Sequence, residues 1–191
     1  DMESALAEGA NIESATLNGV VVMNVPDGNT VSAAEHTLAM ISALSRNIQL
    51  GHMGLINGSW DRHKLVGHEL RGKILGVVGL GKIGREVIKR ALSFDMKILG
   101  YDPYVSQDNF DDSEIKVVSI DELTKSSDYI SLHVPFNDKT KDLFDLKRMK
   151  MMKKTSKIIN VARGGIINEN DLAEALNQEI ISGAAIDVFI N

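Results

Sequence analysis

Short apolar runs recur along most of the chain, and amphipathic segments separate them. The runs at 74–78, 97–102, 129–134, 157–161 and 183–188 have the length of buried strands. Apolar residues at steps of three and four predict helices at 82–93 and 169–178, with shorter ones near 121–125 and 143–151. Buried strands that alternate with helices predict an α/β fold, a doubly wound parallel sheet covered on both faces.

The region before residue 74 has a different pattern. Residues 20–24 form a β-rich run, and the apolar positions from Val31 to Ile48 have the spacing of one long helix. Ser32 and Glu35 fit a capping box at the start of that helix. Residues 51–72 are loop-rich with some helix, and Leu55, Ile56 and Trp60 are large apolar residues in this polar segment. Such residues often mark a partner surface.

A glycine turn follows the first of the five strand runs. Gly79, Gly81 and Gly84 have the G-x-G-x-x-G spacing, which occurs in plain loops as well. Here a strand precedes the turn, a helix follows it, and Asp102 lies 18 residues beyond Gly84. In that context the glycines allow a tight turn, close approach of a pyrophosphate and close helix packing. The pattern predicts a Rossmann-type dinucleotide-binding domain.

Asp102 also indicates which dinucleotide is bound. A carboxylate at this position accepts hydrogen bonds from both ribose hydroxyls, and it repels a 2′-phosphate. Pro103 and Tyr104 supply no arginine to receive such a phosphate. The sequence therefore favours NAD over NADP.

The composition excludes several other classes of function. The chain has 191 residues, 43% of them hydrophobic and 25% charged, with a net charge of −5, so we expect no nucleic-acid partner. The absence of cysteine removes disulfides, thiolate catalysis and cysteine-based zinc sites, and the five histidines have no metal-ligand spacing. No apolar run has the length of a membrane span, and the acidic first residues are not typical of a signal peptide, so we expect no signal peptide and a cytoplasmic protein that contacts no membrane.

Five segments together resemble the D-2-hydroxyacid dehydrogenase family. They are GLGKIGREV, GYDPYVS, SLHVP, NVARGGIINENDLAEAL and SGAAIDVF, and they cover much of the chain in order. The closest resemblance is to the branch that oxidises 3-phosphoglycerate in serine biosynthesis. The resemblance implies that residues 1–19 are the hinge or tail of a substrate domain and that residues 20–191 are the dinucleotide-binding domain. It also implies a homodimer through this domain.

The same resemblance assigns roles to individual residues. Arg163 corresponds to the catalytic arginine, which clamps the substrate carboxylate and polarises the C2 oxygen of a D-2-hydroxy acid. The residues implied in binding NAD are Gly79, Gly81, Lys82, Ile83, Gly84, Asp102, His133, Val134, Pro135, Val161, Ala162, Arg163 and Asp187. The family has two further active-site members, a glutamate and a general-base histidine, and both are expected beyond Asn191. We therefore interpret the chain as the cofactor-binding domain of a longer enzyme, inactive by itself.

Some residues allow a second interpretation. His133 is expected to brace the cofactor loop rather than to transfer protons, and neither His133 nor Asp187 has an orienting partner that the sequence reveals. His36 has no neighbouring member of a site, and Asp187 and Glu169 are not expected to converge. Two other functions also remain open, a glyoxylate or hydroxypyruvate reductase and a non-catalytic, NAD-sensing corepressor-like module. A metal site is not expected.

Overall fold

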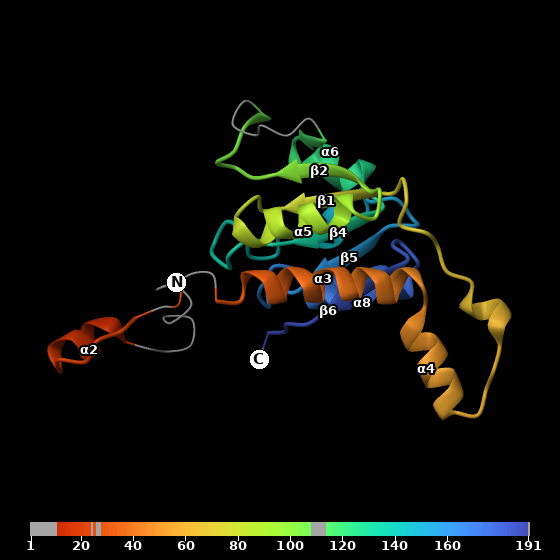
Figure 1. Ribbon diagram of the computed structural model, residues 1–191, viewed down its shortest axis with the longest axis horizontal. Helices are drawn as coiled ribbons and strands as arrows, with labels where there is room; N and C mark the ends of the chain where they lie inside the picture. The colour runs from red at the N-terminus through yellow and green to blue at the C-terminus, as the bar shows by residue number, and fades with distance from the viewer. Residues whose placement is uncertain (1–10, 24, 26–27, 108–113, 191) are drawn as a thin grey trace.

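The computed structural model describes residues 11–23, 25, 28–107 and 114–190 (Figure 1). Its strands are β1 Ile74–Val78, β2 Lys97–Tyr101, β3 Ile115–Val117, β4 Tyr129–Leu132, β5 Lys157–Asn160 and β6 Gly183–Ile186. Its helices are α2 Ile12–Leu17, α3 Thr30–Ser45, α4 Ile48–Ile56, α5 Lys82–Leu92, α6 Ile120–Ser126, α7 Leu146–Met149 and α8 Glu169–Asn177, with a 3-10 turn, η1, at Arg62–Leu65.

The strands form one parallel sheet in the order β3-β2-β1-β4-β5-β6. The chain winds outward from β1 to β3 on one side, and then returns to β4 on the other side of β1. Ligands of open α/β sheets bind at this reversal, outside the carboxyl ends of the strands. The order confirms the doubly wound Rossmann fold.

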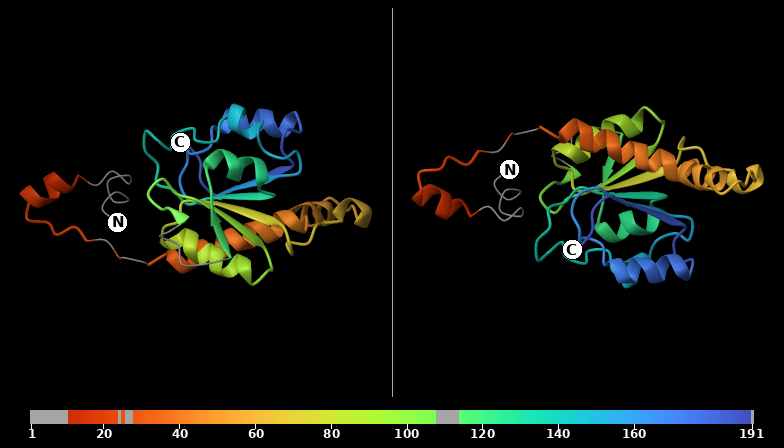
Figure 2. Two further views of the ribbon diagram at one scale, coloured as in Figure 1. Left: turned by 90° about the horizontal axis from the view of Figure 1, so that it is seen from above. Right: turned by 90° about the horizontal axis from the view of Figure 1, so that it is seen from below.

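Helices cover both faces of the sheet (Figure 2). On one face, α3 and α5 bury residues such as Leu38, Ile41 and Val87 in a core with β1 and β2. On the other, α6, α7 and α8 bury Leu123, Met149 and their neighbours. The two cores hold the strands rigid, so that the loops at the strand ends have fixed positions. Among the described residues no helix is both long and apolar enough to cross a membrane.

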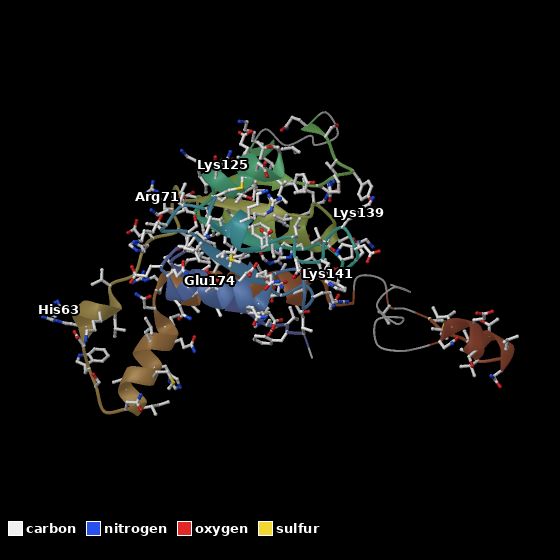
Figure 3. All side chains as sticks on the ribbon, turned by 180° about the vertical axis from the view of Figure 1, so that it is seen from behind. His63, Arg71, Lys125, Lys139, Lys141 and Glu174 are labelled. Carbon is white, nitrogen blue, oxygen red and sulfur yellow. The ribbon has the colours of Figure 1, made fainter. Side chains whose placement is uncertain are left out.

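The predicted long helix is wrong in its length. It ends at Ser45, and Asn47 takes a left-handed backbone conformation with φ 53° before α4 begins at Ile48. Ile48 is 58% exposed and does not continue the buried stripe of α3. The chain of α4 and η1, residues 48–66, projects from the body as an arm, with His63 near its far end (Figures 1 and 3).

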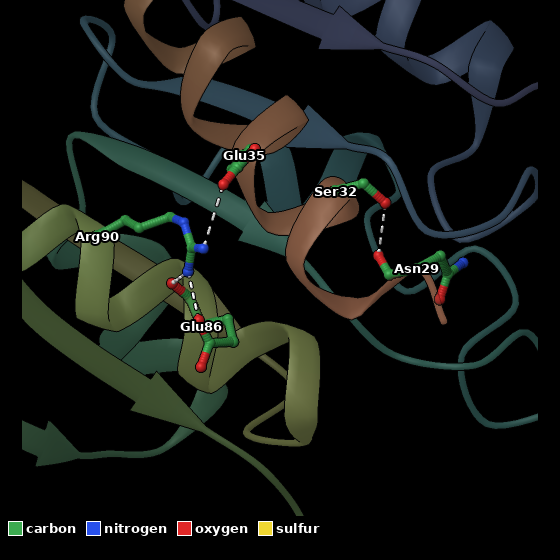
Figure 4. A network of polar contacts seen from close by, with 5 residues as sticks. All are labelled: Asn29, Ser32, Glu35, Glu86 and Arg90. Carbon is green, nitrogen blue, oxygen red and sulfur yellow. Dashed lines mark hydrogen bonds and ion pairs between the residues drawn. The ribbon is translucent and has the colours of Figure 1, made fainter. Parts of the chain in front are cut away.

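The start of α3 also differs from the prediction. No side-chain bond caps the helix at Asn29, so the capping box is wrong. Ser32 Oγ donates to the carbonyl of Asn29 at 3.0 Å, and Glu35 turns to Arg90 of α5 at 3.4 Å (Figure 4). Arg90 also pairs with Glu86, so this network links α3 to α5. The position taken by Glu35 is decided by the neighbouring helix.

The β-rich run at 20–24 forms no strand over residues 20–23, and Asn24 lies outside the described residues. Val20, Val21 and Met23 are exposed, so their β propensity has no sheet to join. The predicted strands ending at 102, 134, 161 and 188 each end one or two residues earlier, because those last residues leave the sheet.

Candidate functional site

The turn after β1 shows a separate reason for each of its three glycines. Gly79 has φ +99°, and a Cβ on it would lie 2.4 Å from the carbonyl oxygen of His133. A Cβ on Gly84 would lie 2.0 Å from the carbonyl oxygen of Gly79, so α5 packs directly on the turn. A Cβ on Gly81 would meet nothing within 4 Å. Gly79 and Gly84 are therefore required by the protein itself, while Gly81 borders open space.

The open space beside Gly81 faces the N-terminus of α5. Gly81 is the N-cap of this helix, and no side chain makes a capping hydrogen bond to its first turn, which starts with Lys82 and Ile83. The helix end carries a partial positive charge and directs its N–H groups outward. Space without a side chain, next to such an end, fits a diphosphate. The structure therefore leaves room for a diphosphate at Gly81, and binding of the pyrophosphate there stays a prediction.

Asp102 lies directly beyond β2 and is held by two main-chain amides. Its Oδ2 accepts from the amide of Leu80 and its Oδ1 from the amide of Tyr104, both at 2.9 Å. Each carboxylate oxygen has two lone pairs, so each can accept one more hydrogen bond. Asp102 is therefore oriented before any ligand arrives, and it keeps the capacity to bind two ribose hydroxyls.

His133 follows β4 and joins it to the glycine turn. Its amide donates to the carbonyl of Val78 at 2.7 Å, and its ring Nε2 lies 2.8 Å from Ser131 Oγ. Burial lowers the pKa of His133 to about 4, because an imidazolium loses its hydration there. The ring is neutral near pH 7. The sequence revealed no orienting partner for His133, and the structure supplies one in Ser131.

Val134 and Pro135 continue from His133 at the same strand end. Val134 is buried in the core beneath β4, and Pro135 is exposed. Thr140 Oγ1 donates to the Pro135 carbonyl at 2.6 Å and fixes the loop that follows. These two residues form an apolar wall next to the glycine turn.

Arg163 lies just beyond the end of β5, on a turn that hydrogen bonds from the Asn160 side chain stabilise. The buried Asn160 side chain accepts from the amide of Ala162 at 3.0 Å and donates to the carbonyl of Arg163 at 2.9 Å. Val161 and Ala162 are half-buried within this turn, and the Arg163 side chain is exposed. Asn160 was not among the predicted site residues. A polar residue at the end of an apolar strand was the signal for it.

Gly164 and Gly165 explain how other segments come close to Arg163. A Cβ on Gly164 would lie 2.3 Å from the Phe189 carbonyl oxygen, so the chain after β6 crosses against this turn. Gly165 has φ +78°, and a Cβ on it would lie 2.7 Å from the ring of Phe136. The two glycines let the loops after β4, β5 and β6 meet around Arg163.

Asp187 follows β6, and its amide donates to the carbonyl of Asn160 at 3.0 Å. Its Oδ1 lies 3.3 Å from Nε2 of His36, which comes from α3. The sequence revealed no partner for either residue, and the structure pairs the two. Glu169 accepts instead from the amide of Ile190 at 2.7 Å. No local pattern in the sequence pairs His36 with Asp187, because His36 lies in α3, before the first strand, and Asp187 follows the last strand.

All the predicted site residues therefore lie at one edge of the sheet, where β1, β2, β4, β5 and β6 end. Gly79 touches His133, and Gly164 touches the chain beyond Asp187. The edge offers room for a diphosphate, an oriented carboxylate for ribose, an apolar wall and an exposed cation.

Comparison with known proteins gives consistent matches. Residues 38–191 match the family described as D-isomer specific 2-hydroxyacid dehydrogenase, NAD binding domain. The chain is 44% identical to the D-3-phosphoglycerate dehydrogenase of Methanocaldococcus jannaschii and 42% identical to that of Bacillus subtilis, in each case over 95% of this chain and 35% of the relative. It thus spans about a third of the length of these relatives.

A solved structure shares the same fold. The NAD-dependent formate dehydrogenase from Staphylococcus aureus, in complex with NAD, superimposes with a TM-score of 0.85 at 38% identity. The superposition covers 94% of this chain and 54% of that one.

Proposed function

This chain belongs to the D-isomer specific 2-hydroxyacid dehydrogenases, a family of NAD-dependent oxidoreductases, and from this we propose that it is the NAD-binding domain of a D-3-phosphoglycerate dehydrogenase. Such an enzyme oxidises 3-phosphoglycerate to 3-phosphohydroxypyruvate for serine biosynthesis. The observation that carries the proposal is the identity of 40–44%, over 95% of this chain, to relatives of that name from archaea, bacteria, plants and animals. Solved D-lactate dehydrogenases are 28–31% identical.

Each cofactor group has a matching place at the sheet edge. The main chain at Gly81, with Lys82 and Ile83 in the first turn of α5, binds the diphosphate. Asp102 accepts hydrogen bonds from the adenosine ribose. Val134, Pro135 and the turn at Val161 border the nicotinamide, whose carboxamide donates to Asp187.

Arg163 binds the substrate. Its planar guanidinium holds the carboxylate of the hydroxy acid and polarises the C2 oxygen, which orients C2 for reaction. NAD, when bound, accepts the hydride from C2. We assign proton abstraction to the histidine that the family carries downstream of this segment. Burial lowers the pKa of His133 to about 4, so its ring is a weak base, and its Nε2 already contacts Ser131.

We also infer that two copies associate through the arm. No residue of α4 is buried, and Trp60 is 68% exposed. The exposed large apolar residues of the arm are Ile48, Leu50, Met53, Leu55, Ile56, Trp60 and Val66. An apolar surface of this kind is covered in a stable protein, and a second copy presents the same surface.

Calorimetry with NAD and NADP tests the cofactor assignment, and wild-type chain is expected to bind NAD and to discriminate strongly against NADP. Assays of the full-length enzyme with 3-phosphoglycerate, glycerate, glycolate and D-lactate test the substrate. Preference for 3-phosphoglycerate supports the proposal. Preference for an unphosphorylated acid contradicts it and indicates a reductase, and NAD binding without turnover of any acid indicates a non-catalytic sensor.

A further inference from the structure

The contact between His36 and Asp187 joins the cofactor-binding end of the sheet to α3. The atoms in contact are Nε2 of His36 and Oδ1 of Asp187, 3.3 Å apart. A carboxylate only accepts hydrogen bonds, so the proton in this contact is carried by Nε2. This holds for the neutral and for the charged imidazole, and the contact therefore does not require a charged histidine.

His36 occupies a fixed place in the fold. The residues Ala34, Leu38 and Ile41 bury one side of α3 against the sheet. Glu35, its neighbour, contacts Arg90 of α5 (Figure 4). The helix is thus anchored on the sheet and on α5, and His36 is presented at its first turns, beside the end of β6.

The main chain of Asp187 is held by the hydrogen bond from its amide to the carbonyl of Asn160, and its side chain contacts His36. Its side chain is 51% exposed and that of His36 is 49% exposed, so the pair adds little to folding stability. What the contact does is restrict the rotamers of the carboxylate. A carboxylate that is already oriented loses less conformational entropy when it accepts a bond from a ligand.

We propose that His36 is a positioning residue for the nicotinamide end of NAD: its Nε2 holds the carboxylate of Asp187 in the orientation that accepts the carboxamide N–H group. The proposal rests on the proposed function, in which Asp187 binds the carboxamide. It predicts an effect confined to the nicotinamide, because the adenosine and diphosphate sites at Asp102 and Gly81 belong to other strand ends.

Calorimetry with two ligands separates this role from a general one. NAD carries the carboxamide, and ADP-ribose has the same adenosine and diphosphate without nicotinamide. For His36→Leu we expect NAD affinity to fall about 3- to 10-fold, the scale of one hydrogen-bond contribution. ADP-ribose affinity is expected to stay within about 2-fold of wild type, because ADP-ribose has no carboxamide and therefore makes no hydrogen bond to Asp187 that the substitution could weaken. His36→Gln, whose amide can still donate to Asp187, should retain most of the NAD affinity.

A double-mutant cycle tests the link to Asp187. In an Asp187→Ala background, His36→Leu should weaken NAD no further, because the group that it positions is gone. Unchanged NAD affinity of His36→Leu, a parallel loss for ADP-ribose, or additive losses in the cycle would each overturn the proposal while leaving the proposed function intact. If the wild-type chain binds neither NAD nor ADP-ribose, the proposed function fails as well.

Discussion

The glycines of the turn after β1 look equivalent in the motif, and the structure gives them different tasks. Gly79 and Gly84 are required because a Cβ would overlap main-chain carbonyl oxygens of the protein itself. Gly81 is surrounded by space on the side where its Cβ would be. Substitutions at these positions should therefore separate folding from binding.

Gly81→Val should reduce NAD affinity by about 100-fold or more, since its side chain fills the diphosphate space and an added group there costs several kcal/mol. Its thermal midpoint should stay near that of wild type. Gly84→Ala is the matched control, and it should lower the midpoint clearly because its Cβ overlaps Gly79. Calorimetry and thermal unfolding measure both. Wild-type NAD affinity of Gly81→Val would contradict the diphosphate site.

Asp102→Ala should weaken NAD by about 1–3 kcal/mol, the contribution of hydrogen bonds to a charged group. The variant also loses the bonds to the amides of Leu80 and Tyr104, which orient the turn. Because the repulsion of a 2′-phosphate disappears, the ratio of NAD to NADP affinity should fall. Equal affinity of wild type for NAD and NADP would show that Asp102 does not select the cofactor.

His133 makes stability depend on pH. Its pKa is about 4 in the folded chain and about 6.5 when unfolded, so protons favour the unfolded state between these values. The contribution of the neutral His133 to the free energy of unfolding is fully present above pH 6.5, and it is lost as the pH falls toward 4. From pH 7 to pH 5 this group should cost about 1–2 kcal/mol. Urea unfolding at both pH values should show a smaller loss for His133→Gln, and an equal loss would contradict its buried, neutral state.

At the scale of elements, the caps of α3 and α8 show how much local sequence decides. Asn168 Oδ1 accepts from the amide of Asp171 at 3.0 Å and starts α8 where the sequence predicts it. At α3 the predicted box of Ser32 and Glu35 does not form, because the helix begins at Thr30 and Ser32 therefore lies inside its first turn, where its Oγ donates to the carbonyl of Asn29. A capping signal succeeds where the helix begins at the residue that follows it.

Asn168→Ala should destabilise the protein by about 1 kcal/mol, the usual contribution of a capping bond. Asn29→Ala is the matched control, because the Asn29 side chain makes no capping bond to α3. Denaturant unfolding of both variants measures the difference. If the two lose the same stability, the Asn168 bond does not act as a cap.

At the scale of the whole molecule, the arm should determine the oligomeric state. Leu55→Asp combined with Trp60→Asp places two charges on its apolar surface and should convert a dimer into a monomer with an intact fold. Sedimentation velocity measures the mass, and circular dichroism checks the fold. Leu176→Asp, on the partly exposed side of α8, should remain dimeric. A monomeric wild type would contradict the interface.

The sequence by itself determined the strands β1, β2, β4, β5 and β6, though not β3, together with the helices α5 and α8, the glycine turn and the class of cofactor. Each of these features depends on the periodicity of apolar residues or on the spacing of a motif within a short stretch of the chain, and such patterns can be recognised without the tertiary structure. The ends of β4, β5 and β6 were placed one or two residues too late, because apolar residues such as Val134 and Val161 continue beyond the strand into the loop that follows it.

Only the tertiary structure decided where α3 ends, that residues 20–23 stay outside the sheet, and which side chains support the site. Asn160 staples the Arg163 turn, and His36 reaches Asp187 from a helix that precedes all the strands. Such contacts join segments that are remote along the chain. His36 and Asp187 meet only because α3 packs against β6, and no local pattern of residues shows that these two segments are neighbours.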